Sequence, residues 1–256
     1  MTDHPRILFG DHRTQMPAID RLIDHDRFDV SFAAFDAVDF RGFDLVVPLR
    51  IDQIAPARAA NADGRRRAVL PAPELVELCD DKLLFNERLV ELGFDDAVPA
   101  LLPDPPGRYP YVRKARRGDF GDGIRVVRAP HEDAPAIPDS FVQEAVAGAD
   151  EYVLHLLRVD GRVRYTLCYR YDMGAELSVR GRLDAPRLIE PADPGPAIGT
   201  CLSILDALGF EGTCCFNYKL TADGLRILGL NPRFGGSLVG DVTNYVAAHL
   251  DAISAG

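Results

Sequence analysis

The sequence predicts an α/β protein in which a short parallel sheet precedes two parts of mixed α+β structure. In the first third of the chain, strand-like apolar runs alternate with helix-like segments, a pattern typical of a parallel sheet. Farther along, Asp160-Gly161 separates two β-rich runs, which is a strong hairpin signal. A second pair of β-rich runs flanks the turn from Thr221 to Gly224.

The position of each helix and strand can be predicted from the spacing of apolar residues and from the glycine, proline and capping residues at its ends. The expected strands span residues 6–10, 28–32, 44–49, 111–115, 123–128, 141–144, 151–159, 162–171, 212–220 and 225–230. The expected helices span residues 16–23, 74–92, 196–208 and 242–253. We expect the second helix to break near Cys79-Asp80-Asp81 and to end at Gly93. No glycine-rich fingerprint follows the first strand, so a dinucleotide site is not expected there.

Composition narrows the class of protein. The 256 residues are 47% hydrophobic and 27% charged, which is the profile of an ordinary globular chain. A formal net charge of -10 argues against a nucleic-acid partner. The start of the chain has no apolar signal region, and no apolar stretch reaches membrane-spanning length. The five cysteines lack metal-ligand spacing and are interpreted as reduced thiols, so we expect a cytoplasmic protein without a membrane partner.

Two short basic runs interrupt this acidic chain, at residues 65–67 and 113–117. A local basic patch in an acidic protein suits a small anionic ligand. A solvated charged face would look the same in the sequence, so both interpretations stay open.

A glycine loop follows the second of these basic runs. Gly118, Gly121 and Gly123 allow sharp turns that bring N–H groups close to an anion, and Lys114 would add a point charge. An ordinary glycine-bearing hairpin is the alternative. The loop is not a Walker P-loop, because no Gly-Lys-Ser/Thr follows.

Two strand ends carry further polar groups. The strand ending at Gln143-Glu144 turns through Gly148 and offers an amide and free backbone groups to a purine, although any strand end looks similar. Asn231-Pro232-Arg233 places an amide and a guanidinium together at another strand end. A proline-terminated strand with a surface arginine is the alternative for that segment.

Taken in order, these segments resemble the ATP-grasp superfamily, which includes biotin carboxylase, carbamoyl-phosphate synthetase and D-alanine–D-alanine ligase. The resemblance covers most of residues 70–240. Its motifs are Asp81-Lys82 with Gly93 and Pro99, Pro110 to Lys114, the glycine loop, Gln143 to Gly148 with Glu151, and Asn231 to Arg233 with Gly235-Gly236-Ser237. It implies a pre-ATP-grasp part at 1–72, a small lid part at 73–148 and a C-terminal part at 149–256, the last two clasping ATP.

The resemblance also implies roles for the phosphate-binding residues. Lys82 and Lys114 would bind the α- and β-phosphates. The loop with Gly118, Gly121 and Gly123 would close over them as a lid.

Further roles concern the nucleoside and the transferred phosphate. The Gln143 side chain, the Glu144 carbonyl and the Val146 N–H would contact adenine, and Glu151 would bind the ribose hydroxyls. Arg233 would neutralise charge on the γ-phosphate and on an acyl phosphate. Gly235-Gly236-Ser237 lies where the family often receives its carboxylate substrate.

The sequence departs from the family at the magnesium site. The family reads Glu-x-Asn-Pro-Arg, and here Gly229 stands at the glutamate position before Asn231. The second ligand falls on Asn217, or on Cys215 with a small register shift. Because magnesium prefers anionic oxygens, two amides would leave it dependent on the nucleotide's phosphates.

Three explanations of this departure stay open. The protein is a weakened relative that binds nucleotide without turnover, or a carboxylate such as Asp241 or Asp172 moves in. Alternatively, the glycine is a peculiarity of this one sequence. Arg180 and Arg182 would recognise an anionic substrate or lie in a solvated loop.

The implied activity is that of an ATP-dependent ligase with ATP and Mg²⁺ as cofactors. It would activate a small-molecule carboxylate as an acyl phosphate for attack by an amine or thiol nucleophile. A non-catalytic nucleotide-binding module is the main alternative, and a kinase is a third. The oligomeric state is open, a homodimer included.

Overall fold

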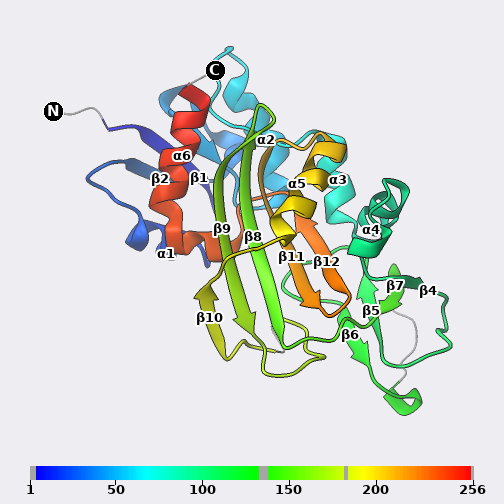
Figure 1. Cartoon of the computed structure of the whole chain (residues 1–256). Coiled ribbons are helices and arrows are strands. Elements are labelled where there is room, and N and C mark those ends of the chain that lie inside the picture. The colour runs from blue at the N-terminus through cyan, green and yellow to red at the C-terminus, as the bar shows by residue number, and fades with distance from the viewer. Residues whose placement is uncertain (1–3, 133–137, 182–183, 255–256) are drawn as a thin grey trace.

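The computed structural model describes residues 4–132, 138–181 and 184–254, and these form three sheets with flanking helices (Figure 1). Among the described residues, no helix has both the length and the apolar character that crossing a bilayer requires. The three sheets follow one another along the chain. The predicted α/β class and the short parallel sheet at the start are confirmed.

The first sheet is parallel and has the strand order β2-β1-β3. Its elements are β1 (Arg6–Gly10), α1 (Met16–Leu22), β2 (Asp29–Ala33), β3 (Leu45–Val47) and the short helix α2 (Ile54–Ala57). The helix α6 (Val242–Ser254) lies beside α1 and this sheet in Figure 1, red against blue. Phe9 of β1 and Tyr245 of α6 are buried in the same core cluster.

The second sheet is antiparallel, has the order β4-β7-β5-β6 and is called the lid sheet below. Its strands are β4 (Leu101–Leu102), β5 (Tyr111–Ala115), β6 (Ile124–Val127) and β7 (Ser140–Glu144), preceded by the helices α3 (Pro73–Asp80) and α4 (Lys82–Glu91). The predicted long helix is therefore broken at Asp81, as expected.

The third sheet, called the large sheet, is antiparallel with the order β10-β9-β8-β11-β12. Its strands are β8 (Asp150–Val159), β9 (Arg162–Asp172), β10 (Leu188–Pro191), β11 (Gly212–Thr221) and β12 (Gly224–Asn231), and α5 (Ala197–Leu208) packs against it. Both predicted hairpins are present, β8–β9 and β11–β12.

The two faces of the large sheet have different chemistry because successive side chains of a strand point to opposite sides. On β11, Cys214, Phe216 and Tyr218 are buried in the cluster that includes α5. The intervening Cys215 and Asn217 line a cavity on the other face. The adjacent Cys214 and Cys215 therefore face opposite sides of the sheet, and all five cysteines are buried and form no disulfide, in agreement with the expected reduced thiols.

A buried carboxylate fixes the break between α3 and α4. The side chain of Asp81 is 1% exposed and accepts hydrogen bonds from the N–H groups of Leu83 and Leu84 at the start of α4. The same carboxylate pairs with Arg116 at 2.6 Å, and the Lys82 N–H donates to the Arg116 carbonyl at 2.8 Å. These contacts attach the start of α4 to the end of β5.

Replacing Asp81 by alanine is expected to lower the free energy of unfolding by about 3 kcal/mol. The change removes a helix cap and leaves Arg116 without its buried partner. Asp80→Ala is the matched control, because Asp80 is 31% exposed and its ion pair with Arg117 lies at the surface. Urea unfolding measures both variants. Equal losses in the two variants would show that Asp81 has no special part in the fold.

Candidate functional site

A cavity of about 1030 Å³ lies between the lid sheet and the polar face of the large sheet. Residues that are far apart in the sequence line this cavity together. The predicted site residues on it are Lys82, Lys114, Gly118, Gly121, Gln143, Glu144, Val146, Glu151, Asn217, Asn231 and Arg233. Gly123 belongs to the glycine loop but not to the cavity wall, because it packs against Ala115 instead.

Two lysines approach this cavity from the lid side. Lys114 on β5 is 7% exposed, and its ammonium lies 3.4 Å from the Leu228 carbonyl of β12. Burial lowers the pKa of Lys114 to about 8, and the charge of Lys82 adds to the effect. Lys82 donates to the Gly118 carbonyl at 2.6 Å, which holds the first residue of the glycine loop. The site therefore holds two clustered positive charges before any anion enters.

The arginines of the two basic runs, at residues 65–67 and 113–117, form ion pairs with aspartates. Arg113 pairs with Asp104, and Arg116 with Asp81. The run at residues 65–67 is paired as well, with Asp44, Asp160 and Asp63. Of the run at 113–117, only Lys114 lines the cavity, so the anionic-ligand interpretation applies to that residue alone.

The glycine loop crosses the cavity and contacts the loop that follows β9. Gly121 has a φ of +76°, and a Cβ there would lie 2.9 Å from the Arg180 carbonyl. A Cβ on Gly181 would lie 2.0 Å from the Phe120 carbonyl. Glycine is therefore required on both sides of this contact, where two backbone segments approach more closely than a side chain permits.

One end of the cavity carries an amide suited to a base. Gln143 is 3% exposed and its Oε1 has no hydrogen-bond partner among the described residues. Its Nε2 lies 3.5 Å from the Pro99 carbonyl. Lys219 holds the segment after β7 by donating to the carbonyls of Val146 and Gly148, at 3.3 and 2.8 Å. A buried acceptor without a partner favours a ligand that donates a hydrogen bond there.

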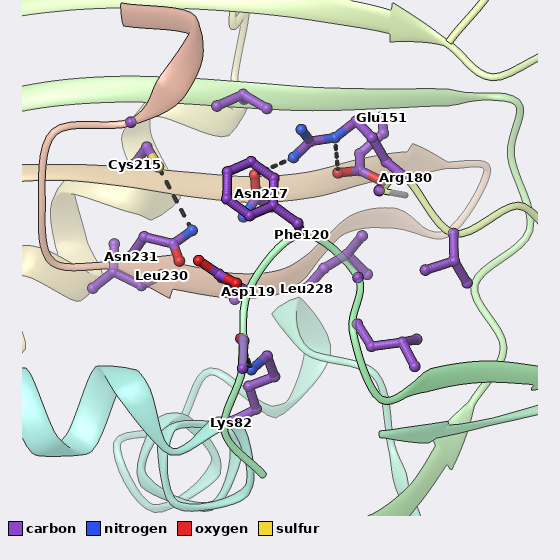
Figure 2. A pocket seen from close by; sticks show the side chains of 18 of the residues that line it. Lys82, Asp119, Phe120, Glu151, Arg180, Cys215, Asn217, Leu228, Leu230 and Asn231 are labelled. Carbon is purple, nitrogen blue, oxygen red and sulfur yellow. Dashed lines mark hydrogen bonds and ion pairs between the residues drawn. The ribbon is translucent and has the colours of Figure 1, made fainter. Parts of the chain in front are cut away.

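Arg180 connects two predicted site residues in the middle of the cavity. Its Nε donates to Glu151 Oε1 at 2.7 Å and its Nη2 to Asn217 Oδ1 at 2.8 Å (Figure 2). The guanidinium lies over the Tyr171 ring, 4.5 Å from its centroid. Burial opposes the charge of Arg180, but the Glu151 carboxylate outweighs it and raises the pKa. The solvated-loop interpretation is therefore wrong for Arg180, and Arg182 lies outside the described residues.

The strand register identifies the position of the expected metal ligands. Asn217 lies directly opposite Gly229, and Cys215 opposite Asn231. Asn217, and not Cys215, is therefore the cross-strand neighbour of the missing glutamate. Asn231 Nδ2 lies 3.6 Å from Cys215 Sγ. A Cβ on Gly229 would have no atom within 4 Å, so the backbone does not require a glycine there.

The carboxylates considered as replacements are occupied elsewhere. Asp241 accepts from the Tyr165 hydroxyl at 2.6 Å, and Asp172 from the Gly174 N–H at 2.8 Å. Neither lies on the cavity wall. The prediction that one of them completes the metal site is therefore not supported by its position.

Of the five described carboxylates that line the cavity, four form ion pairs with arginines. Ion pairs join Asp52 to Arg50, Asp80 to Arg117, Glu144 to Arg108 and Glu151 to Arg180. Asp119 on the glycine loop acts electrostatically on Lys82. Among the described residues, no group of three histidine, cysteine or acidic side chains is arranged to hold a metal. The donor set at Asn217, Gly229 and Asn231 therefore does not fit a magnesium ion, which prefers anionic oxygens.

A histidine that the sequence analysis did not single out also lines the cavity. His155 on β8 is fully buried, and its Nε2 shares a 2.7 Å hydrogen bond with Ser237 Oγ. Burial, with Arg180 and Arg233 nearby, lowers the pKa of His155 to about 3 and keeps the ring neutral. A Cβ on Gly235 would lie 2.4 Å from His155, which explains the glycine. Only its inward position on the strand could have indicated His155.

No protein-family model and no curated protein matches the chain. Solved structures do match. VanG D-Ala:D-Ser ligase from Enterococcus faecalis has a TM-score of 0.66 at 16% identity, with 98% of this chain and 99% of that chain covered. Biotin carboxylase from Campylobacter jejuni has a TM-score of 0.64 at 14% identity, with 97% and 70% covered. D-alanine–D-alanine ligase from Bacillus anthracis, solved with ATP, has a TM-score of 0.61 at 12% identity, with 98% and 97% covered.

These neighbours are ATP-grasp enzymes, and the chain has their fold. The resemblance drawn from the motifs is thus confirmed at the level of the fold.

Lys114→Met is expected to raise the free energy of unfolding by roughly 2 kcal/mol at neutral pH. Burial of the ammonium destabilises the folded protein, and methionine keeps the volume without the charge. Because the pKa of Lys114 is depressed in the folded state, the stability of the wild type rises as pH increases from about 8 to its unfolded value. The difference between variant and wild type should shrink over that range.

Urea unfolding at pH 7 and pH 10 measures this effect. Arg125→Met, on the neighbouring strand β6, is the control, since Arg125 is exposed. A variant that is less stable than the wild type at pH 7 would contradict the prediction.

Proposed function

We propose that this protein binds ATP in the cavity and uses it as an ATP-dependent ligase, joining a carboxylate to an amine or thiol. The observation that carries the proposal is the composition of the cavity wall. The buried amide of Gln143, whose Oε1 has no hydrogen-bond partner among the described residues, lines the same cavity as the cations Lys82, Lys114 and Arg233. A purine with an exocyclic amino group and a polyphosphate tail matches that polarity.

The proposed orientation places adenine at Gln143, Glu144 and Val146, and the ribose at Glu151. The phosphates then extend toward the cations, and the glycine loop covers them. The proposal keeps three parts, 1–72, 73–148 and 149–256, with the nucleotide between the second and third.

The reaction would proceed in two steps. A substrate carboxylate oxygen attacks the γ-phosphorus, the bond from that phosphorus to the β–γ bridging oxygen breaks, and ADP leaves. The amine or thiol then attacks the acyl carbon of the acyl phosphate, loses its proton to solvent and displaces inorganic phosphate. Arg233, which lines the cavity, would neutralise the negative charge of both transition states. The neutral His155 would orient the Ser237 hydroxyl toward the acceptor.

A second candidate is a non-catalytic nucleotide-binding module. It is favoured by the opposed pair Asn217 and Gly229, which presents no carboxylate where the family's pattern has one. Binding without turnover would then regulate a partner.

Coupled ADP release tests the choice between these candidates. With pools of small acids and amino acids, the ligase proposal predicts sustained ADP release over many turnovers only when a carboxylate and a nucleophile are both present. Arg233→Met is expected to lower that rate about 100-fold, because charge stabilisation in the transition state is lost. ATP binding without stimulation by any pool would favour the module, and a stable phosphorylated acid formed without nucleophile would favour a kinase.

A further inference from the structure

A guanidinium occupies the region in which the ATP-grasp pattern expects a divalent cation. The cross-strand pair Asn217 and Gly229 stands at the positions of the family's metal ligands, and Arg180 Nη2 lies 2.8 Å from Asn217 Oδ1. Figure 2 shows Arg180 reaching this amide and Glu151 together. One positive charge is thus already present where a metal would otherwise supply it.

The surroundings hold Arg180 in this position. Glu151, itself 8% exposed, accepts from the guanidinium at 2.7 Å, and the Tyr171 ring lies beneath it. The Arg180 side chain is 27% exposed. Gly121 and Gly181 let the glycine loop approach the backbone next to Arg180. The side chain is therefore fixed by a carboxylate, an amide and an aromatic face, and it is not a loose surface group.

This arrangement is unfavourable for a divalent cation. The amides of Asn217 and Asn231 carry no charge, and Glu151 is already paired with Arg180. A magnesium ion near Asn217 would face the repulsion of a guanidinium in a partly desolvated site. The donors at Asn217, Gly229 and Asn231, with Arg180 beside them, therefore select against the ion.

The same arrangement suits a phosphate. A guanidinium has five N–H donors, and Arg180 gives two of them to acceptors in the described part of the chain. The remaining donors form a planar fork that matches phosphate oxygens. Lys114, Lys82 and Arg233 line the same cavity and add further charge.

We propose that Arg180 replaces the divalent cation and that the cavity binds a nucleoside triphosphate as the metal-free anion. This inference rests on the ATP binding proposed above, which both candidate functions share. In this proposal Arg180 makes the cavity prefer metal-free nucleotide over the magnesium-bound form.

Calorimetric titration of the wild-type protein with ATP, in excess EDTA and in excess magnesium, is the primary test. The expected dissociation constant in EDTA is equal to or lower than that in magnesium. A tenfold or greater loss of affinity in EDTA would overturn the inference while leaving ATP binding intact.

Arg180→Met is the matching variant, with Arg187→Met as its control. Arg187 is exposed in the same loop and does not line the cavity. Arg180→Met should weaken ATP binding at least tenfold in EDTA, whereas Arg187→Met should leave it unchanged. If Arg180→Met binds ATP more tightly than the wild type, Arg180 is a plug that the nucleotide displaces, and the inference is wrong.

A third variant tests the inference in the opposite direction, by attempting to create a dependence of ATP binding on magnesium. Asn217→Asp and Gly229→Glu, combined with Arg180→Met, restore two carboxylates, and the open space at Gly229 accommodates the new side chain. ATP binding by this triple variant should become at least tenfold weaker in EDTA than in magnesium. If ATP binding by the triple variant stays independent of magnesium, the proposal that Arg180 replaces the cation beside Asn217 and Gly229 is contradicted.

The outcomes separate this inference from the ligase proposal. Binding that is indifferent to magnesium, without turnover on any substrate pool, supports the inference and contradicts the ligase. ATP binding that depends on magnesium, together with turnover, supports the ligase and contradicts the inference. Failure to bind ATP under either condition overturns both.

Discussion

The alternation of side chains along the large sheet is the constraint on which both the core and the site depend. On β11, Phe216 and Tyr218 are buried against the α5 side, while Asn217 and Lys219 line the cavity. A one-residue shift in the pairing of this strand would exchange the two sets. The apolar cluster therefore fixes which polar groups reach the cavity, and hydrophobic packing specifies the geometry of the cavity wall.

The electrostatic character of the cavity follows from how its charges are paired. The chain as a whole has a net charge of -10, yet four of the five described carboxylates on the cavity wall are paired with arginines. Lys114 faces the cavity with a carbonyl as its hydrogen-bond partner. The cavity is thus suited to anions inside an acidic protein, because acidic charge in this region is neutralised within the protein. Bulk composition alone would indicate the opposite.

Much of the fold could be predicted from sequence because local residues mark where its helices and strands begin and end. The hairpin turn at Asp160-Gly161 and the helix break at Asp81 both occur where the pattern indicates. The cavity-lining positions of Lys82 and Lys114 followed from motif order, while their roles stay predictions. Arg180 could not be placed, because it lies in an irregular loop whose position depends on Tyr171, Glu151 and the lid backbone. The three-part division also stays a prediction.

The packing of α6 on the first sheet has a consequence for biosynthesis. Ile7 and Phe9 of β1 share their core cluster with Phe234, Val242 and Tyr245. During translation, the first strands leave the ribosome long before the residues that cover them. The apolar face of the first sheet must therefore stay exposed until the residues of α6 have been made, and in that interval it is a surface for chaperones or for misassociation.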